Sequence, residues 1–178
     1  MKFPQKNIII VGMTGVGKTT IGRVLSKETG IKFIDIDQEI EKITNLKIRD
    51  FFNIYGENEF RKLEEKSILK YLNHKEKFII SPGGGILTNQ NIRNAIFQDS
   101  ICIFLKANIS SLISRLKKNL SNRPLLNKGN LEENLKEMYT NRVKYYEESH
   151  ITIDVNNIPV SKVISKIINF LVTYDQND

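Results

Sequence analysis

The stretch Ile8–Thr20 reads IIIVGMTGVGKTT, and it decides the fold. Four apolar residues, Ile8–Val11, predict a buried strand, and the turn after them matches G-x-x-x-x-G-K-[ST] at every fixed position. Glycines let successive backbone amides turn inward around a phosphate, and the N-terminus of the next helix adds N–H groups and partial positive charge. The alternative, a glycine-rich turn with a solvated Lys18, does not account for this full agreement.

This loop predicts a site for a nucleoside triphosphate and Mg²⁺. Lys18 would reach the β- and γ-phosphates, and the hydroxyl of Thr19 would ligate magnesium. The residues expected to contact ATP here are Gly15, Val16, Gly17, Lys18, Thr19 and Thr20.

Composition favours one domain, residues 1–178, that binds anionic ligands. The chain is 40% hydrophobic and 26% charged, with a net charge of +7. A basic balance suits phosphorylated ligands, and because the Lys and Arg residues are scattered, we expect no nucleic-acid partner. No apolar run reaches 18 residues, so we expect no membrane association. Separately, we expect the protein to be a monomer.

The single cysteine, Cys102, lies inside an apolar run and is expected to be a small buried hydrophobe. One cysteine allows no intrachain disulfide, which fits a reducing compartment and a cytoplasmic location. No cluster of His and Cys has metal-ligand spacing, so a zinc site is not expected.

Strands alternate with helices along the chain, which predicts a three-layer α/β fold: a parallel sheet with helices on both faces. We expect strands at 8–11, 32–35, 78–80, 101–105 and 151–155. We expect helices at 17–29, from 37 onward, at 57–73, 89–97, 108–117 and 131–146, and after Pro159. Residues 45–56 are either irregular or a short helix, and Ile40 and Ile43 are expected to face inward.

Ligands of such folds bind at the carboxyl ends of the strands. Three features of the sequence fall there: the phosphate loop, the segment with Asp35 and Asp37, and the turn Gly83–Gly85. The architecture therefore predicts that all three belong to one site.

The aspartates in FIDID suit phosphoryl transfer, which needs one group to hold magnesium and another to take the proton of the attacking hydroxyl. Asp35 and Asp37 are two residues apart, so in an extended chain both side chains would point the same way. The alternative is that Asp37 caps the next helix and Asp35 is a turn residue.

Two arginines are candidates for binding an acidic substrate. Arg61, in EFRKLEE, also fits a surface helix position, paired with Glu64 or Glu65. Arg142 lies on the apolar stripe of the 131–146 helix, where a guanidinium must find a partner or reach water.

Two further segments carry possible ligand contacts. Gly83–Gly85 would allow close approach of the backbone to a ligand, or would simply form a tight turn. Residues 118–130 have little periodicity, and we expect a mobile lid at about 118–128, in which Arg123 is either a phosphate-binding group or a solvated loop residue. Arg115 precedes it and would ordinarily be a solvated surface residue.

Taken in order, GMTGVGKTT, FIDID, EFRKLEE, SPGGG, NRPLL and NRVKYYEE resemble the shikimate kinase family, from Gly12 to about Glu148. The phosphate loop alone is shared by many NTPases, but the combination at these separations is specific. The resemblance implies a P-loop kinase fold like that of nucleoside monophosphate kinases, with a five-stranded parallel sheet. It also implies phosphorylation of the 3-hydroxyl of shikimate by ATP, in the route through chorismate to aromatic amino acids.

The resemblance also implies roles for individual residues. Asp37 would bind a substrate hydroxyl and act as the base, and Asp35 would support magnesium together with Thr19. Arg61 and Arg142 would bind the shikimate carboxylate, whose planar shape suits a guanidinium fork. The backbone of Gly83, Gly84 and Gly85 would contact the substrate. Arg123 would close onto the phosphates, and Arg115, about one position from the family spacing, would lie on the adenine side.

Two other classes of protein remain as alternatives. A related small-molecule kinase, such as a gluconate kinase, would have no reason to combine F-R-x-x-E with G-G-G. A nucleotide switch or nucleic-acid-binding ATPase would not need two arginines for an acceptor, and nucleic-acid binding would depend steeply on salt.

Overall fold

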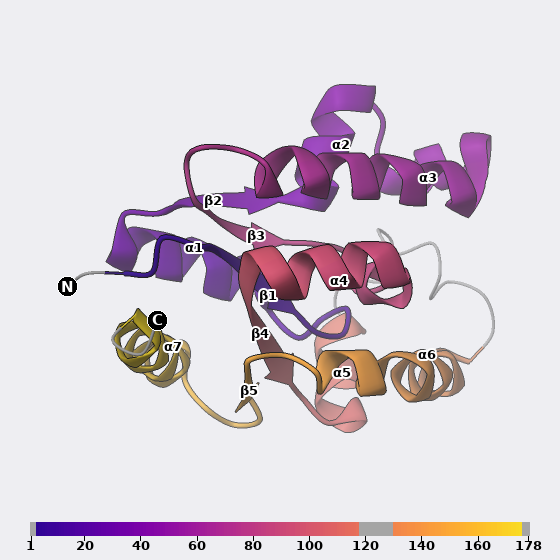
Figure 1. Ribbon diagram of the computed structural model, residues 1–178. Coiled ribbons are helices and arrows are strands. Elements are labelled where there is room, and N and C mark those ends of the chain that lie inside the picture. The colour runs from indigo at the N-terminus through magenta and orange to yellow at the C-terminus, as the bar shows by residue number, and fades with distance from the viewer. Residues whose placement is uncertain (1–2, 118–129, 176–178) are drawn as a thin grey trace.

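The computed structural model describes residues 3–117 and 130–175. Strands and helices alternate along these residues (Figure 1), as the sequence predicts. The strands are β1 (Asn7–Val11), β2 (Lys32–Asp35), β3 (Phe78–Ser81), β4 (Ser100–Lys106) and β5 (Ile151–Asp154). The helices are α1 (Lys18–Thr29), α2 (Ile36–Thr44), α3 (Ile48–Leu72), the 3₁₀ turn η1 (Ile86–Thr88), α4 (Gln90–Asp99), α5 (Ile109–Leu116), α6 (Leu131–Tyr146) and α7 (Val160–Asp175).

The five strands form one parallel sheet in the order β2-β3-β1-β4-β5. β1 lies in the middle, and its Ile9 pairs with Ile80 of β3 and Cys102 of β4. All five residues of β1 are buried, because helices cover the sheet: α4 lies in front of it in Figure 1 and α1 behind it. The three-layer α/β architecture is therefore confirmed, and the phosphate loop leaves the sheet from its centre.

Local sequence sets the ends of the helices. Gly30 ends α1 in the left-handed conformation, with φ of 74°, and its N–H donates to the carbonyl of Ser26. Asn108 begins α5 and Asn89 begins α4, each by accepting hydrogen bonds from the first turn of its helix.

The segment 45–56 contains a short helix that runs into the next one. Gly56 separates the two parts of α3 with φ of 81° and ψ of 174°, a conformation that interrupts the helix. In α2 the expectation for Ile40 is confirmed, but that for Ile43 is wrong, since Ile43 is 60% exposed. The buried residues of α2 are Ile36 and Ile40, and Ile43, one residue before the helix ends at Thr44, packs against no part of the core that the structure describes.

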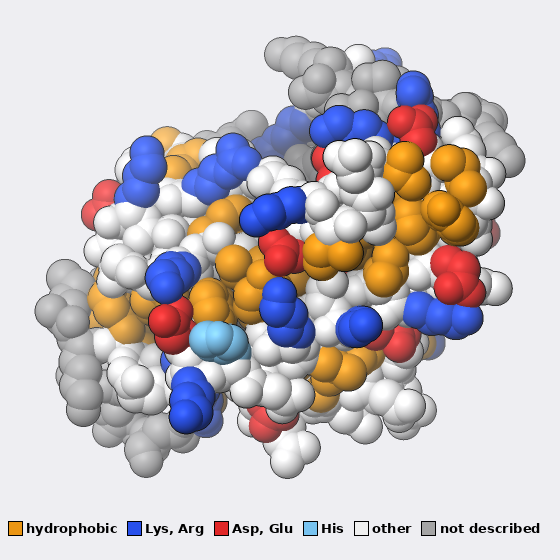
Figure 2. Space-filling view, turned by 90° about the horizontal axis from the view of Figure 1, so that it is seen from above, with side chains coloured by type: hydrophobic (Ala, Val, Ile, Leu, Met, Phe, Trp, Pro, Cys, Tyr) orange, Lys and Arg blue, Asp and Glu red, His pale blue; other side chains and the backbone are white. Residues whose placement is uncertain are grey.

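The surface of the described residues carries charges of both signs. On the face shown in Figure 2, Lys and Arg side chains lie among acidic and hydrophobic ones rather than in one basic patch. Within residues 3–117 and 130–175, no helix has both the length and the apolar character needed to cross a membrane.

Candidate active site

The phosphate loop joins β1 to α1, and its glycines are needed for two reasons. Gly12 and Gly15 have φ of 140° and 81°, conformations that other residues rarely adopt. A Cβ at Gly12 would also lie 2.6 Å from the carbonyl oxygen of Leu105, and one at Gly15 would lie 2.8 Å from Leu116. The loop can therefore keep this shape only with glycine at both positions.

Lys18 is the first residue of α1, and its side chain folds back over the loop. Its Nζ donates to the carbonyl oxygens of Gly12 at 2.9 Å and Met13 at 3.3 Å. The ammonium is thus held at the mouth of the loop, where the spacing of the motif predicts it.

One cavity of about 250 Å³ brings together the phosphate loop and the segment with the two aspartates. Its lining residues are Gly15, Gly17, Lys18, Thr19, Thr20, Asp35, Asp37, Ser81, Pro82, Arg115 and Leu116. Ser81 and Pro82 lead directly into the glycine turn, so all three predicted features meet at the carboxyl ends of adjacent strands.

Asp35 ends β2 and contacts both neighbouring helices. Its Oδ2 accepts a hydrogen bond of 2.6 Å from the hydroxyl of Thr19, and its Oδ1 accepts one of 3.3 Å from the N–H of Gln38. Asp35 is therefore the residue that caps α2, and the alternative that Asp37 does so is wrong. Two hard oxygen atoms, Thr19 Oγ1 and Asp35 Oδ2, lie side by side next to Lys18, a donor set that suits Mg²⁺.

Asp37 lies in the first turn of α2 and lines the same cavity. Its Oδ1 is buried, and it lies 3.5 Å from where a Cβ would stand on Gly83. The carboxylate therefore lies between the phosphate loop and the glycine turn.

Arg61, on α3, is held between two carboxylates of the same helix. Its Nη1 donates to Glu64 at 2.6 Å, while its Nε and Nη2 donate to Glu57 at 3.3 and 3.0 Å. Burial alone would lower the pKa of Arg61, but the charges of Glu64 and Glu57 and their hydrogen bonds outweigh it, so this pKa is raised. The surface pairing expected from spacing is thus formed with Glu64, but in the interior.

The turn Gly83–Gly85 packs directly against this ion pair. A Cβ at Gly83 would overlap Oε1 of Glu64, and one at Gly85 would lie 2.9 Å from Nη2 of Arg61. Small residues are thus required here because the Arg61–Glu64 pair occupies the space beside the turn. This is a reason for the glycines besides a close approach to a ligand.

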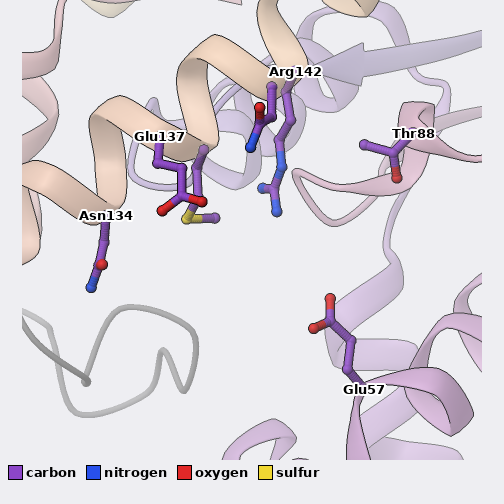
Figure 3. A pocket seen from close by; sticks show the side chains of 7 residues that line it. Glu57, Thr88, Asn134, Glu137 and Arg142 are labelled. Carbon is purple, nitrogen blue, oxygen red and sulfur yellow. The ribbon is translucent and has the colours of Figure 1, made fainter.

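Arg142, on α6, lines a second cavity of about 360 Å³. Figure 3 shows Arg142 and Glu137 entering it from α6, with Glu57 on the opposite side. Thr88 also lines it, and the Thr88 hydroxyl donates to the carbonyl of Gly85 at 2.7 Å. Glu57 binds Arg61, so Arg142 lines this cavity directly, whereas Arg61 is linked to it through its ion-pair partner.

Arg115 lies on the outer side of the phosphate loop. Its Nη1 donates to the carbonyl of Val16 at 2.9 Å and its Nη2 to that of Val155 at 3.3 Å. It lines a third cavity of about 310 Å³ whose walls include Val155, Ile158 and Val163, an apolar strip that sequence reasoning missed. The predicted lid at 118–128, with Arg123, lies outside the described residues.

Sequence reasoning gave no role to Glu57 or Tyr146, and it placed Glu64 only as a surface partner of Arg61. A signal for Glu64 was present, because it follows Phe60 by four residues and precedes Ile68 by four, on the apolar stripe of α3. Glu64 is fully buried on that stripe, as its position predicts.

Comparison with known proteins agrees with this geometry. The family model described as shikimate kinase matches residues 14–172. The shikimate kinase of Thermodesulfovibrio yellowstonii is 36% identical over 164 residues, which is 92% of this chain and 94% of that relative.

Solved structures show the same likeness. A shikimate kinase from Acinetobacter baumannii in complex with shikimate has a TM-score of 0.89 and 32% identity, and the match covers 95% of this chain and 94% of that one. A gluconokinase from Sinorhizobium meliloti has a TM-score of 0.66, with 99% and 97% covered, but at 17% identity it shares only the fold. These likenesses confirm the predicted P-loop kinase fold, and the chain belongs to the shikimate kinase family.

Proposed function

We propose that this chain transfers the γ-phosphoryl group of ATP to the 3-hydroxyl of shikimate, giving shikimate 3-phosphate and ADP. In this role it serves the route through chorismate to aromatic amino acids. The observation that carries the proposal is the cavity shared by Lys18, Thr19, Asp35 and Asp37, which combines a phosphate site with a proton acceptor. The likeness to an enzyme solved in complex with shikimate supports the same acceptor here.

ATP would bind with its phosphates on the loop and its base in the third cavity. Gly15, Val16 and Gly17 present backbone amides, and Lys18 brings positive charge from α1. The apolar strip of Val155, Ile158 and Val163 suits the face of an adenine ring, and Arg115 stands between this strip and the loop.

Magnesium would be held by Thr19 and Asp35, with the remaining positions filled by phosphate oxygens and water. The fit rests on the two oxygen atoms that already lie 2.6 Å apart. When bound, the ion neutralises charge that develops on the phosphates during transfer.

Asp37 would orient the 3-hydroxyl and accept its proton while the oxygen attacks the γ-phosphorus and ADP leaves. Its position between the phosphate loop and Gly83 supports this role, because an acceptor must reach both.

Arg61 and Arg142 would bind the carboxylate of shikimate, while the backbone of Gly83, Gly84 and Gly85 contacts the ring. Arg61 is held in place by Glu64, which leaves its half-exposed partner Glu57 as the carboxylate that a substrate would displace. The acceptor site would thus exchange one carboxylate for another on the same guanidinium.

We also propose that residues 1–178 act as one monomeric domain in the cytoplasm, with shikimate and ATP as partners and neither nucleic acid nor membrane. Arg123, from the lid at 118–128, would join the phosphates on closure and exclude water from the reaction. On the face drawn in Figure 2, basic side chains are interspersed with acidic ones, which supports the expectation of no nucleic-acid partner.

The test is ADP release with ATP and Mg²⁺, offered shikimate, gluconate and nucleoside monophosphates in parallel. We expect turnover with shikimate alone, accompanied by shikimate 3-phosphate detected by mass spectrometry. Turnover with gluconate or a nucleotide, and none with shikimate, would contradict the proposal.

A further inference from the structure

The hydroxyl of Tyr146 lies where three parts of the site meet. Tyr146 is near the end of α6, one turn after Arg142, and is 1% exposed. Its hydroxyl donates to the carbonyl oxygen of Gly84 and lies 3.9 Å from Sδ of Met13 in the phosphate loop. One side chain therefore contacts the glycine turn and the phosphate loop while belonging to the helix that carries Arg142.

The ring of Tyr146 is held as firmly as its hydroxyl. It stacks on Phe104 of β4, with ring centres 5.1 Å apart and planes 28° from parallel. A Cβ at Gly84 would stand in ordinary van der Waals contact, 3.5 Å from the Tyr146 hydroxyl and 3.4 Å from the carbonyl oxygen of Gly12. The turn and the loop therefore meet within van der Waals distance at this hydroxyl.

The hydroxyl remains a donor under working conditions. Burial raises the pKa of Tyr146 to about 12, against the charges of Arg142 and Arg61 and a hydrogen bond with Arg142, which lower it. The phenol is therefore protonated near neutral pH, and its bond to Gly84 does not depend on pH there.

We propose that Tyr146 is a positioning residue that sets the distance between the ATP subsite and the acceptor subsite. The inference rests on the proposed function, in which Met13 belongs to the ATP side and Gly84 and Arg142 to the acceptor side. In-line phosphoryl transfer needs the attacking oxygen close to the γ-phosphorus, and a displacement of about 1 Å can cost roughly 10²-fold in rate. A single buried hydroxyl that donates to the turn and contacts the loop is suited to hold this distance.

The test is Tyr146→Phe, which removes the hydroxyl and keeps the ring on Phe104. We expect kcat for shikimate phosphorylation to fall by roughly 10- to 100-fold, with KM for ATP nearly unchanged. We also expect more ADP per shikimate 3-phosphate formed, because a misplaced acceptor lets water compete. The matched control is Tyr145→Phe. The ring of Tyr145 packs against Arg93, whose Cζ lies 4.3 Å from the ring centre, and this variant should keep the wild-type ratio of ADP to product.

A second pair of variants separates positioning from packing. Phe104→Leu removes the stacked ring but leaves the hydroxyl bonded to Gly84, so it should lower stability while keeping the wild-type ratio of ADP to product. If Tyr146→Phe does not fold, Gly84→Val, whose branched side chain extends beyond a Cβ that itself fits, presses on the same contact from the turn and should raise that ratio. All variants are assayed well below their melting temperatures.

The outcomes separate this inference from the function on which it rests. A wild-type protein that does not phosphorylate shikimate contradicts the proposed function. A wild-type protein that does so, together with a folded Tyr146→Phe of unchanged kcat and ratio, contradicts the positioning role alone. The same kinetic loss in Phe104→Leu at matched stability would also contradict it.

Discussion

Arg61 donates through Nη1 a hydrogen bond of 2.6 Å to Glu64, whose side chain is fully buried, while Arg61 itself stays 23% exposed. One end of the guanidinium is therefore anchored in the interior, and the other is bonded to Glu57, which lines the second cavity. A substrate carboxylate would meet an arginine that is already oriented, so less conformational entropy would be lost on binding. The following predictions test this site.

Lys18→Ala should abolish turnover while leaving the fold intact. Lys18 brings the ammonium to the phosphates, and its loss removes two hydrogen bonds to loop carbonyls but none of the buried core side chains. ADP production and thermal melting measure the two effects. Lys27→Ala, at an exposed position in the last turn of α1, is the control and should retain full activity. Undiminished ADP production by a folded Lys18→Ala variant would overturn the assignment of the loop.

Asp37→Asn should lower kcat by roughly 10²–10⁴-fold, the usual contribution of a general base. The amide keeps the shape of the side chain but cannot accept the proton, so ATP affinity should hardly change. Asp99→Asn, at an exposed position that ends α4, is the matched control. A loss of less than about threefold would make Asp37 a residue that only orients the substrate.

Arg61→Ala and Arg142→Ala should each weaken the use of shikimate by about 2–5 kcal/mol, the usual cost of truncating one partner of a buried charge pair. An analogue without the carboxylate should respond little to either change. Arg61→Ala should also lower the free energy of unfolding more than Arg142→Ala does, because it leaves the buried charge of Glu64 without its partner. Equal losses with the analogue would mean that both arginines are structural.

Asp35→Asn should raise the Mg²⁺ concentration needed for half-maximal rate at fixed ATP. The amide keeps a hydrogen bond with the Thr19 hydroxyl but supplies no negative charge to the ion. A magnesium titration of both proteins measures the shift, and Asp99→Asn again serves as the control. An unchanged titration midpoint would show that Asp35 does not support the metal.

Cys102 should resist alkylation in the folded protein. Burial raises the pKa of its thiol to about 12, although a hydrogen bond with Ser149 lowers it. Because the thiolate is the nucleophile, a pKa raised this far leaves very little of the reactive form at pH 8. Mass spectrometry after iodoacetamide treatment should show modification in urea but not in buffer. Rapid modification of the folded protein would mean that β4 opens to solvent.

The sequence alone determined the order of the elements and the place of the site. The phosphate loop, the alternation of strands and helices, and the bounds of β2 and α6 could all be read from local pattern. Such features depend on neighbouring residues, whose spacing sets hydrophobic periodicity and helix caps. The prediction that Ile43 faces the core was wrong. Periodicity shows which face of a helix is apolar, but not which residues of that face contact the rest of the core.

The tertiary structure alone decided which charges are buried and what the glycines are for. An i, i+3 pair such as Arg61 and Glu64 has the same spacing on a solvated helix as on a covered one. Its Glu64 end is buried here because the turn Gly83–Gly85 lies against the pair. That turn is distant in sequence and is brought there by the pairing of β3 with β1. The role of Tyr146 likewise arises only when α6, β4 and the phosphate loop are packed together, because contacts between distant segments leave no local pattern in the chain.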